Sequence, residues 1–217
     1  MWTYRGVNVH WLGHDSFVLQ GSKTIVLDPF KARGEYKADF LLISHEHYDH
    51  FSEDDIRRFS APSTIIVAPK QCEEPLRQFK QEKKIVEPGQ KIELNGVKIE
   101  AVPAYNLNKF REPGKVFHPR EDKKVGYVVT LDGVRFYHAG DSDATPEMKA
   151  LDVDVALLPV SGTYVMTAEE AAEAAKEIKA KVVIPMHFGK LVGTREDAER
   201  FKKIVGGDKN VEILEPE

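Results

Sequence analysis

The sequence has almost no cysteine and no long apolar segment. Cys72 is the only cysteine in 217 residues, so an internal disulfide is excluded and a reducing compartment is favoured. No apolar run reaches the ~18 residues that a membrane-spanning helix needs. The segment Met1–Arg5 does not lead into a signal peptide. These absences predict a soluble, cytoplasmic protein without a membrane partner.

The chain also lacks the features of several other protein classes. It has 31 Lys and Arg against 35 Asp and Glu, a net charge of −4, so no general basic surface predicts a nucleic-acid partner. It contains no Gly-x-Ser-x-Gly elbow and no Gly-rich phosphate-binding loop. No linker or repeat interrupts it, and 41% hydrophobic residues suffice for one substantial core. We expect a single domain over residues 1–217, with the oligomeric state left open and a homo-oligomer as one alternative.

What the sequence does contain is a dense cluster of metal-ligating side chains. The segment His45–His50 reads His-x-His-x-Asp-His and directly follows the apolar run Phe40–Ile43, which is typical of a buried strand. Ser52 and the three acidic residues after it are typical of a helix start. The cluster therefore lies on a loop between a strand and a helix, where α/β sheets commonly hold a ligand. Imidazole and carboxylate together suit Zn, Mn, Fe or Ni.

The spacing inside this cluster indicates which side chains share an ion. In extended backbone, His45 and His47 point to the same side and can bind one ion together. Asp49 and His50 are adjacent and are better placed to serve a second ion. The alternative is a solvated polar loop with chance histidines. The density of ligands and the strand–loop–helix context favour a metal site.

The remaining sequence predicts mixed sheets with helices outside them. Asn95–Gly96 and Asp132–Gly133 each join two short apolar segments and predict hairpins. Thr167 opens a capping box and predicts a helix to about Ala180. Residues 73–84 predict a charged, exposed helix. This order of elements is consistent with layered sheets covered by helices.

The pattern at His45–His50 resembles the signature of the metallo-β-lactamase superfamily. The resemblance implies an α+β fold, a four-layer αββα sandwich, with a hydrolytic site for one or two metals at one rim. Asp141, which follows a strand and Gly140, stands where the superfamily has the carboxylate that bridges two metals. His187 resembles the last ligand of the superfamily. An aspartate in an ordinary turn and a lone histidine at a strand end are the alternatives.

One ligand position departs from that pattern. In related branches a histidine ends the strand that matches Val102–Tyr105, but Asn106 follows here, and an amide oxygen is a poor ligand for these metals. We class Asn106 as substrate-binding. The only nearby histidine is His118, in the long, charged loop from residue 107 to 124. We expect this loop to fold back so that His118 completes the first metal site. The alternative is a substrate-facing or surface His118 beside a mononuclear or half-open site.

Two residues near the N-terminus belong to the same rim. His14 lies in a Gly-His-Asp-Ser turn that resembles the Gly-His-Ala-Ser-type turn of the lactonase and phospholipase D branches. It either faces the site as a substrate-binding residue or is structural. Asp28, at a strand end, is expected to brace a loop. Over nearly the whole chain, the sequence resembles the ascorbate-6-phosphate lactonase-like hydrolases.

The resemblance implies an enzyme with one or two divalent ions, Zn, Mn, Fe or Ni, as cofactors. Its expected metal ligands are His45, His47, Asp49, His50, His118, Asp141 and His187, and its expected catalytic residues are Asp49 and Asp141. A water between two ions loses a proton near neutral pH, so a metal-bound hydroxide would attack a small-molecule ester, lactone or phosphodiester. The alternative is a nucleic-acid processing metallonuclease of the same superfamily. The charge and the lack of room for a clamp domain argue against that alternative.

Overall fold

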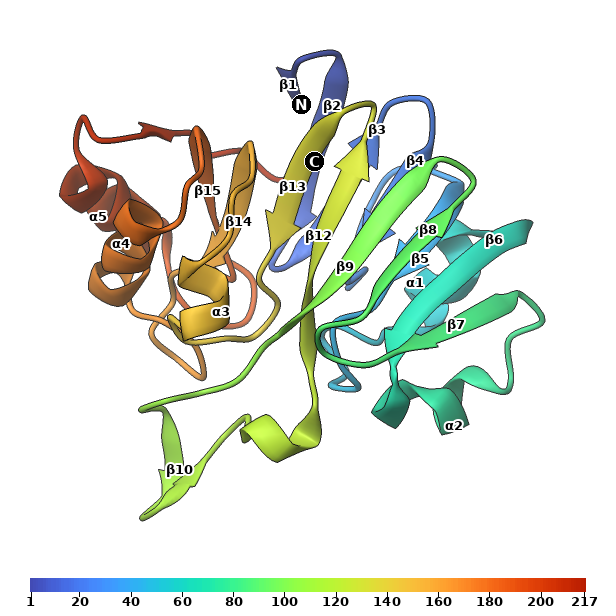
Figure 1. The fold of residues 1–217 in the computed structure, drawn as a ribbon, viewed down its shortest axis with the longest axis horizontal. Helices are drawn as coiled ribbons and strands as arrows, with labels where there is room; N and C mark the ends of the chain where they lie inside the picture. The colour runs from blue at the N-terminus through green and yellow to red at the C-terminus, as the bar shows by residue number, and fades with distance from the viewer.

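A computed structural model describes residues 1–217, and two seven-stranded sheets form its centre (Figure 1). The first sheet follows chain order, antiparallel as far as β4 and parallel from β4 onward. Its strands are β1 (Trp2–Tyr4), β2 (Val7–Gly13), β3 (Ser16–Gln20), β4 (Thr24–Leu27), β5 (Ala38–Leu42), β6 (Ser60–Pro69) and β7 (Glu82–Val86).

The second sheet has the order β16-β15-β14-β13-β12-β9-β8. It is antiparallel from β8 to β13 and parallel from β13 to β16, so it repeats the plan of the first sheet. Its strands are β8 (Lys91–Leu94), β9 (Val97–Pro103), β12 (Val125–Leu131), β13 (Val134–His138), β14 (Val155–Pro159), β15 (Val182–Met186) and β16 (Asn210–Val211).

Helices cover both outer faces, which gives the four-layer αββα arrangement that the sequence predicted. Figure 1 shows the helices at the two opposite flanks of the sheets. Side chains alternate along each strand, so Phe40 and Leu42 join the main core of 49 residues while Leu41 joins a second cluster with Ile56. The helices are α1 (Glu53–Phe59) and α2 (Glu73–Leu76) on one flank, and α3 (Pro146–Lys149), α4 (Ala168–Glu177) and α5 (Arg195–Val205) on the other.

Local predictions from the sequence have mixed outcomes. Both predicted hairpin turns are confirmed, and Asn95 and Asp132 have the positive φ angles, 50° and 51°, that such tight turns use. The helix predicted over residues 73–84 is wrong, because α2 ends at Leu76 and the chain then pairs in parallel with β6 as β7. Tertiary strand pairing overrides local helix preference here. The capping box at Thr167 is present, but α4 ends at Glu177.

The long loop after β9 contains structure of its own. A small hairpin, β10 (Phe110–Glu112) with β11 (Lys115–Val116), projects from the two sheets (Figure 1). The 3₁₀ turn η2 (Arg120–Asp122) follows it. Between them the chain returns to the rim, where the backbone N–H of Asn106 donates to the carbonyl of His118 at 2.8 Å.

No helix in the structure is both long enough and apolar enough to cross a bilayer.

Candidate metal centre

Strand ends and turns from both sheets deliver histidine and aspartate side chains to one rim. The loop after β5 carries four of them, and the chain after β13 and after β15 carries one each. The ligand atoms form three groups of four, and within each group all lie within 4.8 Å of one another. Two of the groups share no residue, and the third, made of Asp15, His50, Asp141 and His187, overlaps both of them. The first group is His45, His47, His118 and Asp141, and the second is His14, Asp49, His50 and His187.

The first group holds three imidazoles against one carboxylate. Nε2 of His45 lies 3.0 Å from Nδ1 of His47. Nε2 of His118 lies 3.6 Å from Oδ2 of Asp141, and Nε2 of His45 lies 3.8 Å from the same oxygen. The structure therefore brings His118 from the long loop beside His45, His47 and Asp141, and its role as a ligand stays a prediction.

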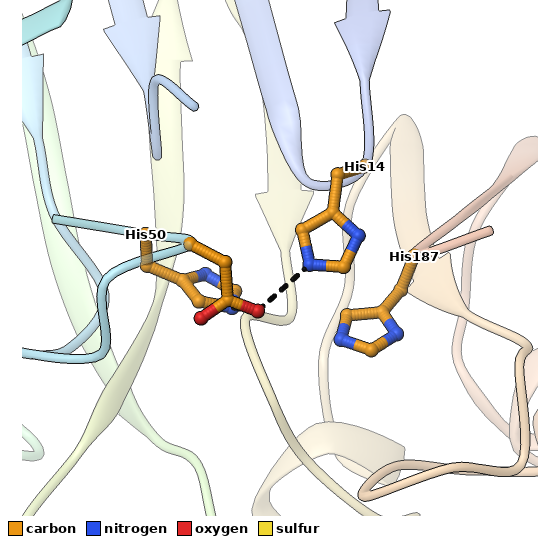
Figure 2. Close-up of side chains that lie close together, drawn as sticks. His14, His50 and His187 are labelled. Carbon is orange, nitrogen blue, oxygen red and sulfur yellow. Dashed lines mark hydrogen bonds and ion pairs between the residues drawn. The ribbon is translucent and has the colours of Figure 1, made fainter. Parts of the chain in front are cut away.

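The second group lies on the other side of Asp141. Oδ1 of Asp141 is 3.2 Å from Nε2 of His50 and 3.3 Å from Nε2 of His187. Figure 2 shows the side chains of His14, His50 and His187 close together. Oδ2 of Asp49 lies 3.1 Å from Nε2 of His14. Asp141 thus turns one oxygen toward each group.

The second ring nitrogen of several of these histidines is held by a polar partner. Nδ1 of His50 lies 2.8 Å from Oδ2 of Asp28, which also accepts from the hydroxyl of Ser44 at 2.5 Å. The same hydroxyl is 2.9 Å from Nδ1 of His45. Nδ1 of His187 lies 2.8 Å from the hydroxyl of Ser161. These contacts orient the opposite nitrogen, Nε2, toward the centre. Asp28 braces the loop, as expected.

The donor set fits divalent ions. Nε2 of His50, Nε2 of His187 and Oδ1 of Asp141 are buried without a hydrogen-bond partner. Such atoms are costly to leave unpaired, and a metal ion would pair all three. Burial lowers the pKa of His118 to about 4 and that of His187 to about 3. Both rings are therefore neutral near pH 7 and can bind a metal without first losing a proton.

The carboxylates of Asp141 and Asp49 are ionised. Burial alone would raise the pKa of Asp141, but the neighbouring His50 holds that pKa well below its usual value. Burial would also raise the pKa of Asp49, but the hydrogen bond from His14 lowers it. By contrast, burial raises the pKa of the nearby Asp15 well above its usual value. The carboxyl of Asp15 therefore loses its proton less readily than those of Asp49 and Asp141, which makes it the poorer ligand of the three.

Asn106 lies beside the centre in a bracing position. Its side-chain Oδ1 accepts from the backbone N–H of His118 at 2.8 Å, and its Nδ2 donates to the carbonyl of Tyr164 at 2.9 Å. The residue is only 5% exposed. Asn106 therefore contacts the same histidine, His118, that the sequence predicts as the ligand in its place. A contact between Asn106 and substrate stays a prediction.

Sequence reasoning missed Lys124 and Ser161 as neighbours of the centre, and it left the position of His14 open. His14, expected to face the site or to be structural, is fully buried and lies in the second ligand group. Lys124 is 2% exposed, and its Nζ lies 3.1 Å from Nε2 of His47 and 3.4 Å from Oε1 of Glu46. No motif surrounds Lys124 or Ser161, so only the fold identifies them. For His14 the available signal was the glycine before it, because both residues have positive φ in a tight turn.

Comparisons with known proteins agree with this geometry. The family described as "Beta-lactamase superfamily domain" matches residues 8–187. The chain is 35% identical to a UPF0173 metal-dependent hydrolase of Thermococcus onnurineus, with 97% of each chain covered. Its structure is similar to that of a protein described as a metal-dependent hydrolase from Parabacteroides distasonis, with a TM-score of 0.80, 33% identity, and 97% and 94% of the two chains covered. It is also similar to a metallo hydrolase from Ignicoccus hospitalis, with a TM-score of 0.79, 26% identity, and 97% and 95% covered.

Proposed function

The chain belongs to the metallo-β-lactamase superfamily and is a metal-dependent hydrolase, and from this premise we propose that it binds two divalent ions and hydrolyses an ester, lactone or phosphodiester bond in a small molecule. The observation that carries the proposal is the position of Asp141. One of its oxygens lies 3.6 Å from His118, and the other lies 3.3 Å from His187. A carboxylate placed in this way supports a bridge between two ions.

Each ion would have its own set of protein ligands. His45, His47 and His118 would hold the first ion, and Asp49, His50 and His187 would hold the second, with Asp141 shared. His14 is within reach of the second ion. A set of nitrogen and oxygen ligands without thiolate suits Zn, Mn, Fe or Ni. When bound, such ions would acidify a water molecule and polarise the bond to be broken.

The residues of the chain have their own tasks in this proposal. The braced imidazoles keep the ligand atoms oriented before any ion arrives, so less ordering is needed on binding. Asp49 is ionised and its side chain is 16% exposed, so it can accept a hydrogen bond from a water molecule at the rim. Asp141 supplies negative charge between the two ions. Burial of the centre on the sheet side excludes bulk water there.

Metal analysis of the purified protein tests the proposal. The protein is purified without added metal and then reloaded with Zn or Mn. Inductively coupled plasma mass spectrometry of the reloaded protein should find more than one divalent ion per chain. A screen of esters, lactones and phosphodiesters should then find turnover that a chelator removes and the metal restores. Wild-type protein that binds no metal, or turnover that the chelator does not affect, would refute the proposal.

A further inference from the structure

A cavity of about 470 Å³ opens directly onto the metal centre. This volume is in the range of sites for small organic molecules, roughly 300–1,000 Å³. Ten residues line it, and five of these belong to the centre. The other five form a surface that we call the apolar mouth: Tyr48, Phe117, Tyr164, Leu191 and Val192.

The C-terminal side of the apolar mouth is a short, anchored loop. The backbone N–H of Gly189 donates to the carbonyl of Gly193 at 3.2 Å and closes the loop that carries Leu191 and Val192. Nζ of Lys190 donates to the carbonyls of Leu12 at 3.2 Å and of Phe30 at 2.9 Å. The loop is thereby fastened to the neighbouring strand ends. Leu191 is nevertheless 39% exposed, so the loop presents this side chain instead of burying it.

The opposite side of the mouth is aromatic. Tyr164 has a φ of +67°, an uncommon value for a bulky residue, and the hydrogen bond from Asn106 to its carbonyl holds it there. Its ring meets Phe117 edge-on at 4.8 Å between centroids. Tyr48, between two expected ligands, is 68% exposed. Three separate loops therefore bring large apolar side chains to one opening, which is typical of a ligand surface.

No lysine or arginine lines this cavity. The basic side chains nearby contact other protein groups. Lys190 binds backbone carbonyls, Lys109 pairs with Glu170 at 2.5 Å, and Lys124 lies behind His47. A phosphate or carboxylate on the part of a substrate remote from the ions would be desolvated there without a partner, which is costly.

We propose that the substrate is an uncharged carboxylic ester or lactone whose aryl or alkyl group packs against the apolar mouth, and not a phosphorylated sugar. This inference rests on the proposed hydrolytic function. In the reaction, water adds to the carbonyl carbon and the ester carbon–oxygen bond breaks. The products are a carboxylate, an alcohol and one proton, and a lactone gives the carboxylate and the alcohol in one molecule.

Rates on a homologous series of esters test the assignment. With 4-nitrophenyl esters from acetate to octanoate, kcat/KM should rise roughly threefold per added methylene until the cavity is filled. An otherwise identical ester with a terminal phosphate should lose that gain. A flat series, or faster turnover of the phosphate-bearing ester, would overturn the proposal.

Two leucine variants provide the matched comparison. Leu191→Asp should lower kcat/KM for the octanoate ester about tenfold or more, with little change for the acetate ester and none in metal content. Leu107→Asp changes a leucine that is 50% exposed and does not line the cavity, and it should leave both rates unchanged. Equal losses in the two variants, or an equal loss on both esters in Leu191→Asp, would contradict a role in binding the acyl chain.

A binding measurement separates this inference from the proposed function. Calorimetry with 4-phenylbutanamide and 4-phenylbutyl phosphate on chelator-treated protein needs neither metal nor turnover. The uncharged amide should bind more tightly than the phosphate, and Leu191→Asp should weaken its binding. Tighter binding of the phosphate would overturn the inference even if the protein hydrolyses esters. Preferential binding of the amide by a protein that hydrolyses nothing would support the apolar mouth and refute the hydrolase proposal instead.

Discussion

The metal centre and the apolar mouth are built in opposite ways. Centre residues such as His45 and His50 are fully buried and have their second nitrogen held, whereas Tyr48 and Leu191 are 68% and 39% exposed on loops. The two sheets fix the first region, and the loop anchors fix the second. We infer that the strand ends set the chemistry and the loops set the choice of substrate, as is general when sites are carried on one shared fold.

We expect the largest effect from removing a predicted metal ligand of the first group. His45→Ala should empty one site and abolish hydrolysis, because His45 faces both His47 and Asp141. The matched control is His10→Ala, since His10 is a buried histidine on β2 that contacts Glu217 and lies outside the centre. Mass spectrometry for metal and an activity assay check both variants. Full metal content in His45→Ala would show that the first group is not a metal site.

His118 lies in the buried centre but comes from a loop that also carries part of the apolar mouth. Its removal therefore tests whether it binds metal or substrate. His118→Ala should lower affinity for one ion by at least the 10–100-fold typical of losing a supporting residue, because a direct ligand is removed. Circular dichroism should show an intact fold. If His118 only contacts substrate, the variant will keep full metal content and show a raised KM or a lower kcat.

The bracing behind the ligands should matter less than the ligands themselves. Asp28→Asn places an amide donor against either the N–H of Ser44 or the ring of His50, because the two partners contact different carboxylate oxygens, so one orienting contact is lost. We expect metal affinity to fall about 10–100-fold with all ligands still present. Asp154→Asn changes a carboxylate that contacts Arg135 away from the centre and should leave affinity unchanged. Unchanged affinity in Asp28→Asn would mean that the sheet alone orients the ring.

Asn106 links the two regions, because its amide contacts both His118 and Tyr164. Asn106→Ala leaves the backbone N–H of His118 without its acceptor, and we expect a loss of about 1–3 kcal/mol in the free energy of unfolding. Urea denaturation of the metal-free protein measures this loss. Metal occupancy should persist because every ligand remains. Unchanged stability would argue that water replaces the amide and that Asn106 is free for substrate.

The smallest expected effect concerns nucleic acid. With a net charge of −4 and no lysine or arginine lining the cavity, the protein should show no appreciable affinity for duplex DNA or structured RNA at physiological salt. Fluorescence anisotropy checks this. A submicromolar, salt-sensitive dissociation constant would favour the nuclease alternative. It would also contradict the binding of an uncharged ester at the apolar mouth.

How far the sequence predicts this molecule depends on how local each signal is. The loop at His45–His50, Asp141 and His187 each follow a short apolar strand, so their convergence at one rim could be predicted before the structure. His118 could be proposed only because no other histidine was near the position of Asn106. The roles of all these side chains as ligands stay predictions.

Other features have no local signal. Residues 73–84 resemble a helix in composition, but pairing with β6 draws their last three residues into β7. Ser161 and Lys124 contact the ligand rings only because strands far apart in the chain lie side by side. The apolar mouth likewise combines four loops, and no single segment of the sequence indicates it.

The central claim is that Asp141 stands between two ions, and electron paramagnetic resonance of the Mn²⁺-loaded protein tests it most directly. Two Mn²⁺ ions that share a carboxylate should give a spin-coupled spectrum at two equivalents per chain. Asp141→Asn should weaken that coupling. A wild-type protein that takes up only one Mn²⁺, or that binds two with the spectrum of isolated ions, would contradict the account.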